Sequence, residues 1–107
     1  MAAEPDPALQ LIDNPAEHRY ELREAGAVLV FITYRIEGGR MTMVHTETDP
    51  AAGGRGLASR LADFALRDAA DRSLLVVPSC PFVRGYLVRH PELRHVVAPG
   101  ALDVSGD

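Results

Sequence analysis

A cluster of glycines lies near the middle of the chain, between a segment that predicts a strand and one that predicts a helix. The cluster and the start of the predicted helix read Gly53-Gly54-Arg55-Gly56-Leu57-Ala58. The first backbone N–H groups of a helix have no partner within the helix and carry partial positive charge, so they attract anions. Glycine lets an anion approach the main chain because it has no Cβ. The segment therefore predicts a phosphate-binding site.

Two common phosphate-binding loops do not fit this segment. The P-loop needs Lys and then Ser or Thr after its last glycine, whereas Gly56 is followed by Leu57 and Ala58 and the chain contains no lysine. The dinucleotide-binding loop needs a third glycine and an acidic residue at the end of the next strand. Ser59 stands at that glycine position, and the next predicted strand ends at Val77-Pro78-Ser79-Cys80. The P-loop is excluded, and the dinucleotide loop fits poorly.

His45 and Glu47 are candidates for proton transfer in the strand that precedes the glycines. Alternation with a period of two predicts one face made of Met41, Met43, His45 and Glu47. Histidine accepts a proton near neutral pH, so the pair could act as a base that deprotonates an amine, directly or through water. The competing interpretation is a polar pair that only satisfies neighbouring strands.

Cys80 is the one cysteine of the chain and a candidate nucleophile. It follows a predicted strand directly and precedes a predicted helix that starts at Pro81. A helix N-terminus favours the negatively charged thiolate, which is the nucleophilic form. The competing interpretation is a small buried cysteine that only packs, as most single cysteines do.

Hydrophobic patterning places these residues in a small α/β domain. The predicted strands are 18–22 as an edge strand, 27–34, 41–48, 74–77 and a last one around 95–97. The turn at 37–39 makes 27–34 and 41–48 an antiparallel hairpin. Helices are predicted over 57–70, from an apolar stripe at helical spacing, and over 81–90, which Pro91 ends. If the first helix is a crossover, strand 74–77 runs parallel to 41–48.

Length and composition limit the possible classes of protein. A chain of 107 residues with 47% hydrophobic and 24% charged residues predicts one globular domain. A net charge of −4 argues against a nucleic-acid partner, and no apolar run reaches the ~20 residues that span a membrane. With a single cysteine, the cytoplasm is the expected location. We expect a loose arm over residues 1–14, the folded domain over 15–98 and a flexible tail over 99–107; residues 9, 11 and 12 could alternatively form a short strand.

Taken in order, several motifs resemble a small single-domain subfamily of the GCN5-related N-acetyltransferases. They are His45-Thr46-Glu47, Gly54-Arg55-Gly56-Leu57-Ala58, Val77-Pro78-Ser79-Cys80-Pro81-Phe82-Val83, Tyr86-Leu87 and Arg89-His90-Pro91. The resemblance covers residues 20–97. One departure is Ala51, where the family has Gln or Arg before its Gly-x-Gly loop. It removes a side-chain contact and leaves the backbone loop intact.

The resemblance implies acetyl-CoA as the cofactor, bound where two neighbouring parallel strands separate. The glycine loop would bind the pyrophosphate, with Arg55 adding charge. Thr46, Glu47 and Thr48 would offer strand-edge backbone groups to the pantetheine amides, while Cys80 would lie near the thioester and could carry the acetyl group. Tyr86 would protonate the departing thiolate, or else only pack. The implied cofactor-binding set also includes Gly53, Ser79 and Phe82, and Arg84, Arg89 and His90 are weaker candidates for the 3′-phosphate.

The sequence thus predicts a minimal acetyltransferase fold: a mixed, mostly antiparallel sheet with two main helices. The predicted function is acetyl transfer from acetyl-CoA to an unidentified amine, with Cys80, Tyr86, His45 and Glu47 as catalytic candidates and no metal site. The alternatives are a coenzyme A-binding module or sensor with little turnover, and a subunit of a larger assembly that supplies the acceptor pocket. A homodimer is a further open alternative.

Overall fold

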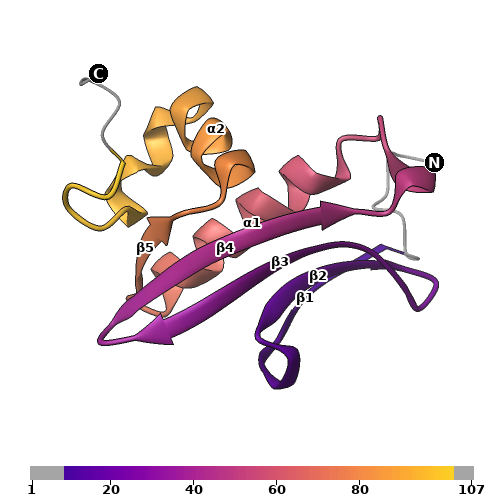
Figure 1. Cartoon of the computed structure of the whole chain (residues 1–107), viewed down its shortest axis with the longest axis horizontal. Coiled ribbons are helices and arrows are strands. Elements are labelled where there is room, and N and C mark those ends of the chain that lie inside the picture. The colour runs from indigo at the N-terminus through magenta and orange to yellow at the C-terminus, as the bar shows by residue number, and fades with distance from the viewer. Residues whose placement is uncertain (1–8, 103–107) are drawn as a thin grey trace, which may run out of the picture.

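The computed structural model describes residues 9–102 and shows a five-stranded sheet with two main helices (Figure 1). The strands are β1 (Leu9–Asn14), β2 (Arg19–Glu24), β3 (Ala27–Glu37), β4 (Arg40–Thr48) and β5 (Leu75–Pro78). The helices are α1 (Leu57–Asp71) and α2 (Pro81–Arg89), and short 3-10 helices cover Pro15–Glu17, Pro50–Ala52 and Pro91–Val96. The strand order is β1-β2-β3-β4-β5, antiparallel except for the parallel pair β4 and β5. This confirms the predicted mixed sheet.

Both helices lie on one face of the sheet, and the core forms between them and that face (Figure 1). The apolar stripe of α1 is buried as its spacing predicts, through Leu57, Leu61, Ala62, Ala65, Leu66 and Ala69. On the sheet, this face presents Tyr20, Leu22, Val30, Ile32, Met41 and Met43, all without exposed surface. Each fully buried large apolar side chain contributes roughly 1.5–3 kcal/mol. Burial of this face therefore holds α1 against β2, β3 and β4.

The predicted face of β4 is wrong from Val44 onward. Thr33 pairs with His45 but the next residue of β3, Tyr34, pairs with Met43, so Val44 is an extra residue in β4. Such a β-bulge exchanges the two faces of the strand beyond it. Met41 and Met43 are buried under the helices, whereas His45 and Glu47 are exposed on the opposite face.

Three further predictions about the elements are corrected by the structure. Leu9–Asn14 form β1, so the expected loose arm is wrong for these residues and the alternative of a short strand there is confirmed; residues 1–8 lie outside the described part. Because β1 pairs along its whole length with β2, β2 is not an edge strand. The last predicted strand is wrong: Pro91–Val96 is a 3-10 helix whose Leu93 and Val96 are buried three residues apart, and only Val97 bridges to β5. Of the predicted tail, residues 103–107 lie outside the described part.

The second face of the sheet has no helix over it within residues 9–102, and we call it the open face (Figure 1). Glu21 lies on this face with only 1% of its surface exposed. Its carboxylate accepts hydrogen bonds from Arg19, Arg23 and Asn14 at 2.7 Å, 2.8 Å and 3.1 Å.

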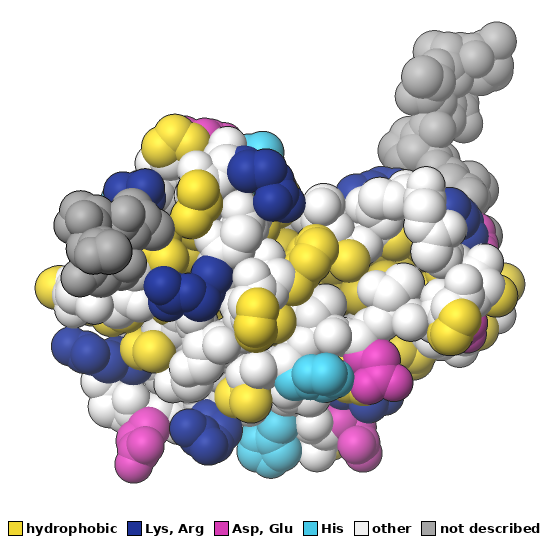
Figure 2. Space-filling view, turned by 45° about the horizontal axis from the view of Figure 1, so that its top comes forward, with side chains coloured by type: hydrophobic (Ala, Val, Ile, Leu, Met, Phe, Trp, Pro, Cys, Tyr) yellow, Lys and Arg dark blue, Asp and Glu magenta, His cyan; other side chains and the backbone are white. Residues whose placement is uncertain are grey.

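On the face shown in Figure 2, arginine side chains are scattered among apolar and polar ones and do not form a continuous basic surface.

The Glu21 carboxylate should make stability depend on pH. Burial by itself would raise its pKa, but the hydrogen bonds from Arg19, Arg23 and Asn14 outweigh burial and hold the pKa below its ordinary value of 4.5. A carboxyl whose pKa is lower in the folded state stabilises the fold above the ordinary value, and this stability is lost as the pH falls through the lowered pKa.

We therefore expect the free energy of unfolding of the Glu21→Gln variant to be lower at pH 7 and to depend less on pH between 6 and 3 than that of wild type. Urea titrations across this range measure both quantities. Glu37→Gln, an exposed change at the far end of β3, serves as control. Parallel curves for wild type and Glu21→Gln would contradict the assignment.

Candidate functional site

The parallel pair β4 and β5 separates at the centre of the molecule. Pairing between them runs from Arg40 with Leu75 to Met43 with Pro78, and β4 then continues to Thr48 paired with β3 only. Proline cannot donate a ladder hydrogen bond, so Pro78 is a natural end for β5. Within residues 9–102, the edge of β4 beyond Met43 that faces away from β3 therefore has no strand partner.

The start of α2 turns in beside this free edge and brings Cys80 to β4. The Cys80 N–H donates to the carbonyl of Met43 at 2.9 Å. The Cys80 sulfur lies 3.1 Å from the hydroxyl of Thr46, and either atom can be the donor. Cys80 is only 2% exposed and holds the N-cap position of α2. Thr46 reaches it because the bulge at Val44 turns this threonine toward the helices.

The glycine loop leads from β4 into α1 through backbone conformations that only glycine adopts readily. Gly54 has φ +83° and Gly56, the N-cap of α1, has φ +73°. A Cβ built on either residue would meet no atom within 4 Å, so the space in front of the loop is open. No side chain of the described residues caps the first turn of α1. The loop therefore presents uncapped helix amides to an open space.

A cavity of about 280 Å³ lies in front of these amides. It is lined by Thr48, Ala52, Gly53, Gly54, Gly56, Leu57, Ala58, Ser59 and Phe82. We call it the glycine-loop cavity. Thr48 belongs to the free end of β4 and Phe82 to the first turn of α2, so the cavity joins the loop to the two elements that hold Cys80. Backbone donors with an open approach suit a diphosphate, and the residues present therefore fit this part of coenzyme A.

The cavity lining does not include six of the predicted cofactor-binding residues: Thr46, Glu47, Arg55, Ser79, Cys80 and Tyr86. The Arg55 guanidinium makes two hydrogen bonds to the Glu24 carboxylate of β2, at 3.1 Å and 3.0 Å. Hydrogen bonding from Arg55 lowers the pKa of Glu24. Ser79 is exposed, and its N–H donates to the carbonyl of Val77 at 3.0 Å.

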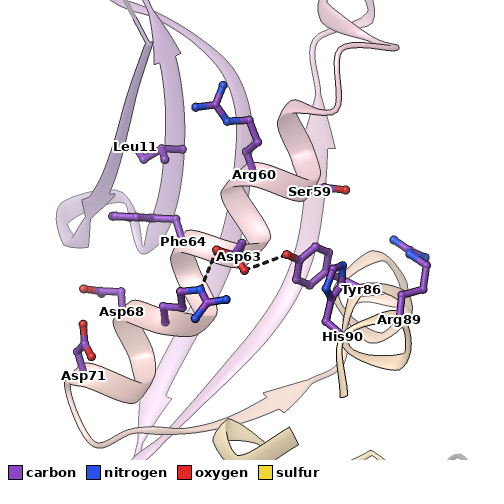
Figure 3. Close-up of a pocket in the computed structure, with 11 residues that line it drawn as sticks. Leu11, Ser59, Arg60, Asp63, Phe64, Asp68, Asp71, Tyr86, Arg89 and His90 are labelled. Atoms are coloured by element: carbon purple, nitrogen blue, oxygen red, sulfur yellow. Dashed lines mark hydrogen bonds and ion pairs between the residues drawn. The ribbon is translucent and has the colours of Figure 1, made fainter. Parts of the chain in front are cut away.

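Tyr86 connects the two helices. Its hydroxyl donates to the Asp63 carboxylate on α1 at 2.9 Å, and its ring stacks on that of His90 with 4.0 Å between centroids (Figure 3). Tyr86 and His90 line a groove of about 620 Å³ that runs along α1 between β1 and α2. Burial raises the pKa of Tyr86 to about 12, aided by the hydrogen bond to Asp63 and the charge of that carboxylate. In this arrangement the phenol is a weaker acid than an ordinary tyrosine.

His45 and Glu47 lie on the open face, across β4 from Thr46. The His45 imidazole is 3.2 Å from the Glu47 carboxylate, and the side chains are 59% and 63% exposed. The His45 ring also contacts Phe31 of β3, with 6.4 Å between centroids. The structure thus brings Thr46 together with Cys80, and it places His45 and Glu47 on the other side of the same strand segment.

A family model described as GCN5-related N-acetyl-transferase matches residues 19–96 of the chain. The chain belongs to this family. It is also similar to a GCN5-like protein from Staphylococcus aureus whose solution structure was determined by NMR. The two share 23% sequence identity, with 87% of this chain and 91% of the other covered and a TM-score of 0.66. At this identity the likeness shows the fold, which is that of the acetyltransferase family.

Sequence reasoning missed two contacts of this acetyltransferase domain. Asp63 accepts a hydrogen bond from Arg67 of its own helix at 2.8 Å, as the i,i+4 spacing allows, but it also accepts one from Tyr86 of α2 at 2.9 Å. The spacing inside one helix cannot show which residue of another helix lies opposite. The contact between Thr46 and Cys80 was missed because the bulge that turns Thr46 inward has no clear signal in the sequence.

Among the residues that the structure describes, no group of metal-binding side chains and no membrane-spanning helix is found. The described His, Cys, Asp and Glu residues include no group of three or more placed to hold a metal ion. None of the described helices is both long and apolar enough to cross a membrane.

The link between Tyr86 and Asp63 can be tested by titrating the phenol. We expect the Tyr86 pKa to lie near 12 in wild type and to be lower but still above 10 in Asp63→Asn, because the negative charge that opposes ionisation is removed while burial, the largest cause of the shift, remains. NMR of ring-labelled tyrosine between pH 8 and 12.5 measures both values. Arg67→Gln is the matched control on the other partner of Asp63. An unchanged titration in Asp63→Asn would show that this carboxylate does not control Tyr86.

Proposed function

We propose that this chain binds acetyl-CoA and transfers the acetyl group to an amine. One observation carries the proposal: the uncapped start of α1 and the end of β4 line one cavity, and the Cys80 sulfur lies on the same free segment of β4, 3.1 Å from the Thr46 hydroxyl. Membership of the acetyltransferase family supports the general activity.

The cofactor would lie along three features of the domain. Its diphosphate would accept hydrogen bonds from the loop and the first turn of α1, where the helix dipole also favours negative charge. The unpaired edge of β4 at Thr46–Thr48 would pair with the pantetheine amides as a strand pairs with a peptide. Phe82, in the wall of the glycine-loop cavity, would pack on the pantetheine chain.

Acetyl transfer could pass through Cys80. The Cys80 sulfur would give its proton to a base and attack the thioester carbonyl carbon; the carbon–sulfur bond to coenzyme A would then break, and the coenzyme A thiolate would leave and take up a proton. An amine would next attack the acetylated Cys80, releasing the acetylated amine and restoring the thiol. Direct attack of the amine on the thioester is the alternative route. In both routes the attacking nitrogen must lose a proton, and His45 with Glu47 could accept it.

The raised pKa of Tyr86 and its hydrogen bond to Asp63 do not favour the predicted role of this residue as the acid that protonates the departing thiolate. A phenol with a pKa of about 12 would protonate a thiolate, whose ordinary pKa is about 8.5, only against the equilibrium. To act on the departing thiolate, the hydroxyl would first have to leave Asp63. We therefore assign Tyr86 the role of holding α2 against α1 beside the cofactor.

A coenzyme A-binding sensor remains the second candidate because Cys80 is only 2% exposed. A buried sulfur in contact with Thr46 suits recognition of a bound thioester as well as attack on it. Turnover separates the two functions. An enzyme releases many equivalents of free coenzyme A in the presence of amines, whereas a sensor binds one equivalent and stops.

The glycine loop supplies the main test. Gly56→Ala forces a side chain to adopt φ +73° at a residue that lines the glycine-loop cavity, so we expect acetyl-CoA affinity to fall at least tenfold and stability to fall by about 1–2 kcal/mol. Calorimetry with acetyl-CoA measures the affinity, and release of free coenzyme A with a panel of primary amines measures turnover.

Gly38→Ala is the matched control for this test, because Gly38 also has positive φ (+60°) but lies in the turn between β3 and β4. It should lose similar stability and keep its affinity for acetyl-CoA. Equal affinities in the two variants, or no binding by wild type at millimolar acetyl-CoA, would refute the proposed cofactor site.

The covalent route through Cys80 predicts an acetylated protein when no amine is present. Mass spectrometry after incubation with acetyl-CoA should find an added acetyl group on the peptide that contains Cys80, and none in Cys80→Ala. Thr46→Val should reduce the rate of labelling, because it removes the hydroxyl 3.1 Å from the sulfur while keeping nearly the same volume. If wild type turns over amines without ever carrying this label, transfer is direct.

A further inference from the structure

We propose that the outer edge of β1 and the groove beside it bind an extended segment of a partner protein. In that segment a basic, an apolar and an acidic side chain stand two positions apart. The groove is the one of about 620 Å³ along α1, and we call it the α1 groove. This inference goes beyond the proposed function and does not depend on it.

β1 is the last strand of the sheet, and its edge away from β2 has no strand partner among residues 9–102. Such an edge offers N–H and C=O groups to a further strand unless proline, charged side chains or a covering element protect it. Leu9–Asn14 contain no proline, and their single charged side chain, Asp13, accepts a hydrogen bond from the Tyr34 hydroxyl. β1 therefore lacks the protection that proline and unpaired charges give.

β1 runs beside α1 and in the same direction. At its start, Leu9 pairs with Glu24, whose carboxylate binds Arg55 just before α1. Near its end, Asp13 lies 3.4 Å from the guanidinium of Arg72, the C-cap of α1. A strand added outside β1 would therefore lie along the α1 groove, and its side chains that point the same way as Leu11 would face α1.

Three side chains of α1 form a row with the spacing that such a strand needs. Arg60, Phe64 and Asp68 line the α1 groove and extend toward the side of β1, whereas Asp63 extends toward Tyr86 (Figure 3). Members of the row are four residues apart, which is about 6 Å along a helix. Side chains on one face of a strand repeat every two residues, about 6.8 Å. Three successive side chains of an added strand could thus each meet one member of the row.

The two ends of this row carry opposite charge. Arg60 is exposed and makes no ion pair with the other residues of 9–102. At the far end, Asp68 accepts from the Tyr20 hydroxyl at 2.7 Å and lies 3.3 Å from Arg72, and the neighbouring Asp71 is exposed. Two carboxylates share this end, so it favours a cation, and the end at Arg60 favours an anion.

The middle of the row is apolar. Phe64 and Leu11 line the α1 groove between its charged ends, and both also pack against the core. The Phe64 ring meets that of Tyr20 edge-on, with 5.9 Å between centroids. This contact holds the ring in place, so an apolar side chain of the partner would find a fixed surface.

These features give the partner segment a sequence pattern. Antiparallel pairing is the slightly more stable form, and a segment antiparallel to β1 runs from the end at Asp68 to the end at Arg60. It would therefore read basic-x-apolar-x-acidic from its own N-terminus. Backbone pairing with β1 would supply affinity, and the row on α1 would supply selectivity.

Three peptides of the form Thr-X-Thr-Leu-Thr-Z-Thr test the pattern on the 15N-labelled protein. X and Z are arginine and glutamate in the mixed peptide, two arginines in the basic peptide and two glutamates in the acidic one, with blocked ends. In NMR titrations, the mixed peptide should shift the amides of β1 at concentrations at least fivefold lower than either other peptide. Equal responses to the three peptides, or no shift along β1 at millimolar mixed peptide, would overturn the proposal.

The variant Arg60→Glu should change which peptide binds best, because it makes both ends of the row acidic. We expect the basic peptide to bind this variant at least fivefold more tightly than the mixed peptide does. Arg35→Glu, the same change at an exposed residue of β3, is the matched control and should keep the order of wild type. An unchanged order in Arg60→Glu would count against the row as the recognition element.

Backbone pairing is tested with two N-methylated forms of the mixed peptide. The N–H groups of successive strand residues point to opposite edges, so one form is methylated at arginine, leucine and glutamate and the other at the two inner threonines. One form should lose binding to β1 and the other should keep it. Binding by both forms, or by neither, would contradict pairing at the edge.

A second copy of the chain, pairing through its own β1, is the other possible occupant. Sedimentation without peptide distinguishes it, because the proposal expects a monomer at all concentrations. A dimer of wild type that dissociates in Arg60→Glu would assign the edge to a second copy and overturn the proposal. None of these measurements uses acetyl-CoA, so failure of the proposed function would not affect them.

Discussion

The site depends on the point at which β4 and β5 stop pairing. Pro78 ends the ladder opposite Met43, and β4 continues for five residues with one unpaired edge. An unpaired edge normally invites association with another strand. In this domain α2 turns in beside it, and its first residues place Cys80 against Thr46. Beyond this contact, the end of β4 and the first turn of α2 both line the glycine-loop cavity.

Two local features, the bulge at Val44 and the glycine loop, determine which groups surround this edge. The bulge at Val44 turns Thr46 and Thr48 toward the helices and sends His45 and Glu47 to the open face. The glycine loop then reverses the chain, so that α1 begins beside the end of β4 with its first amides uncapped. One short stretch of chain thus supplies the proposed anion site on one face and carboxylates on the other.

Features set by local chemistry could be predicted from the sequence, and features set by pairing could not. The glycine loop, α1 and the start of α2 follow from glycines, apolar spacing and proline, which act over a few residues. The faces of β4 could not be predicted beyond Val44, because one inserted residue reverses the alternation and any residue type can occupy a bulge. β1 was uncertain because so short a strand is stable only through its pairing with β2. The link between Tyr86 and Asp63 depends on the packing of two helices.

The measurement that tests the central claim most directly is an amide NMR titration of the 15N-labelled protein with coenzyme A. If the freed amides of α1 hold the diphosphate, the largest shifts will fall on Gly54, Gly56, Leu57 and Ala58, with smaller ones along the free end of β4. Dephospho-coenzyme A, which keeps the diphosphate, should produce the same pattern at the loop. A saturating response that leaves these four amides unmoved, for example one confined to the groove at Asp63, would contradict the account.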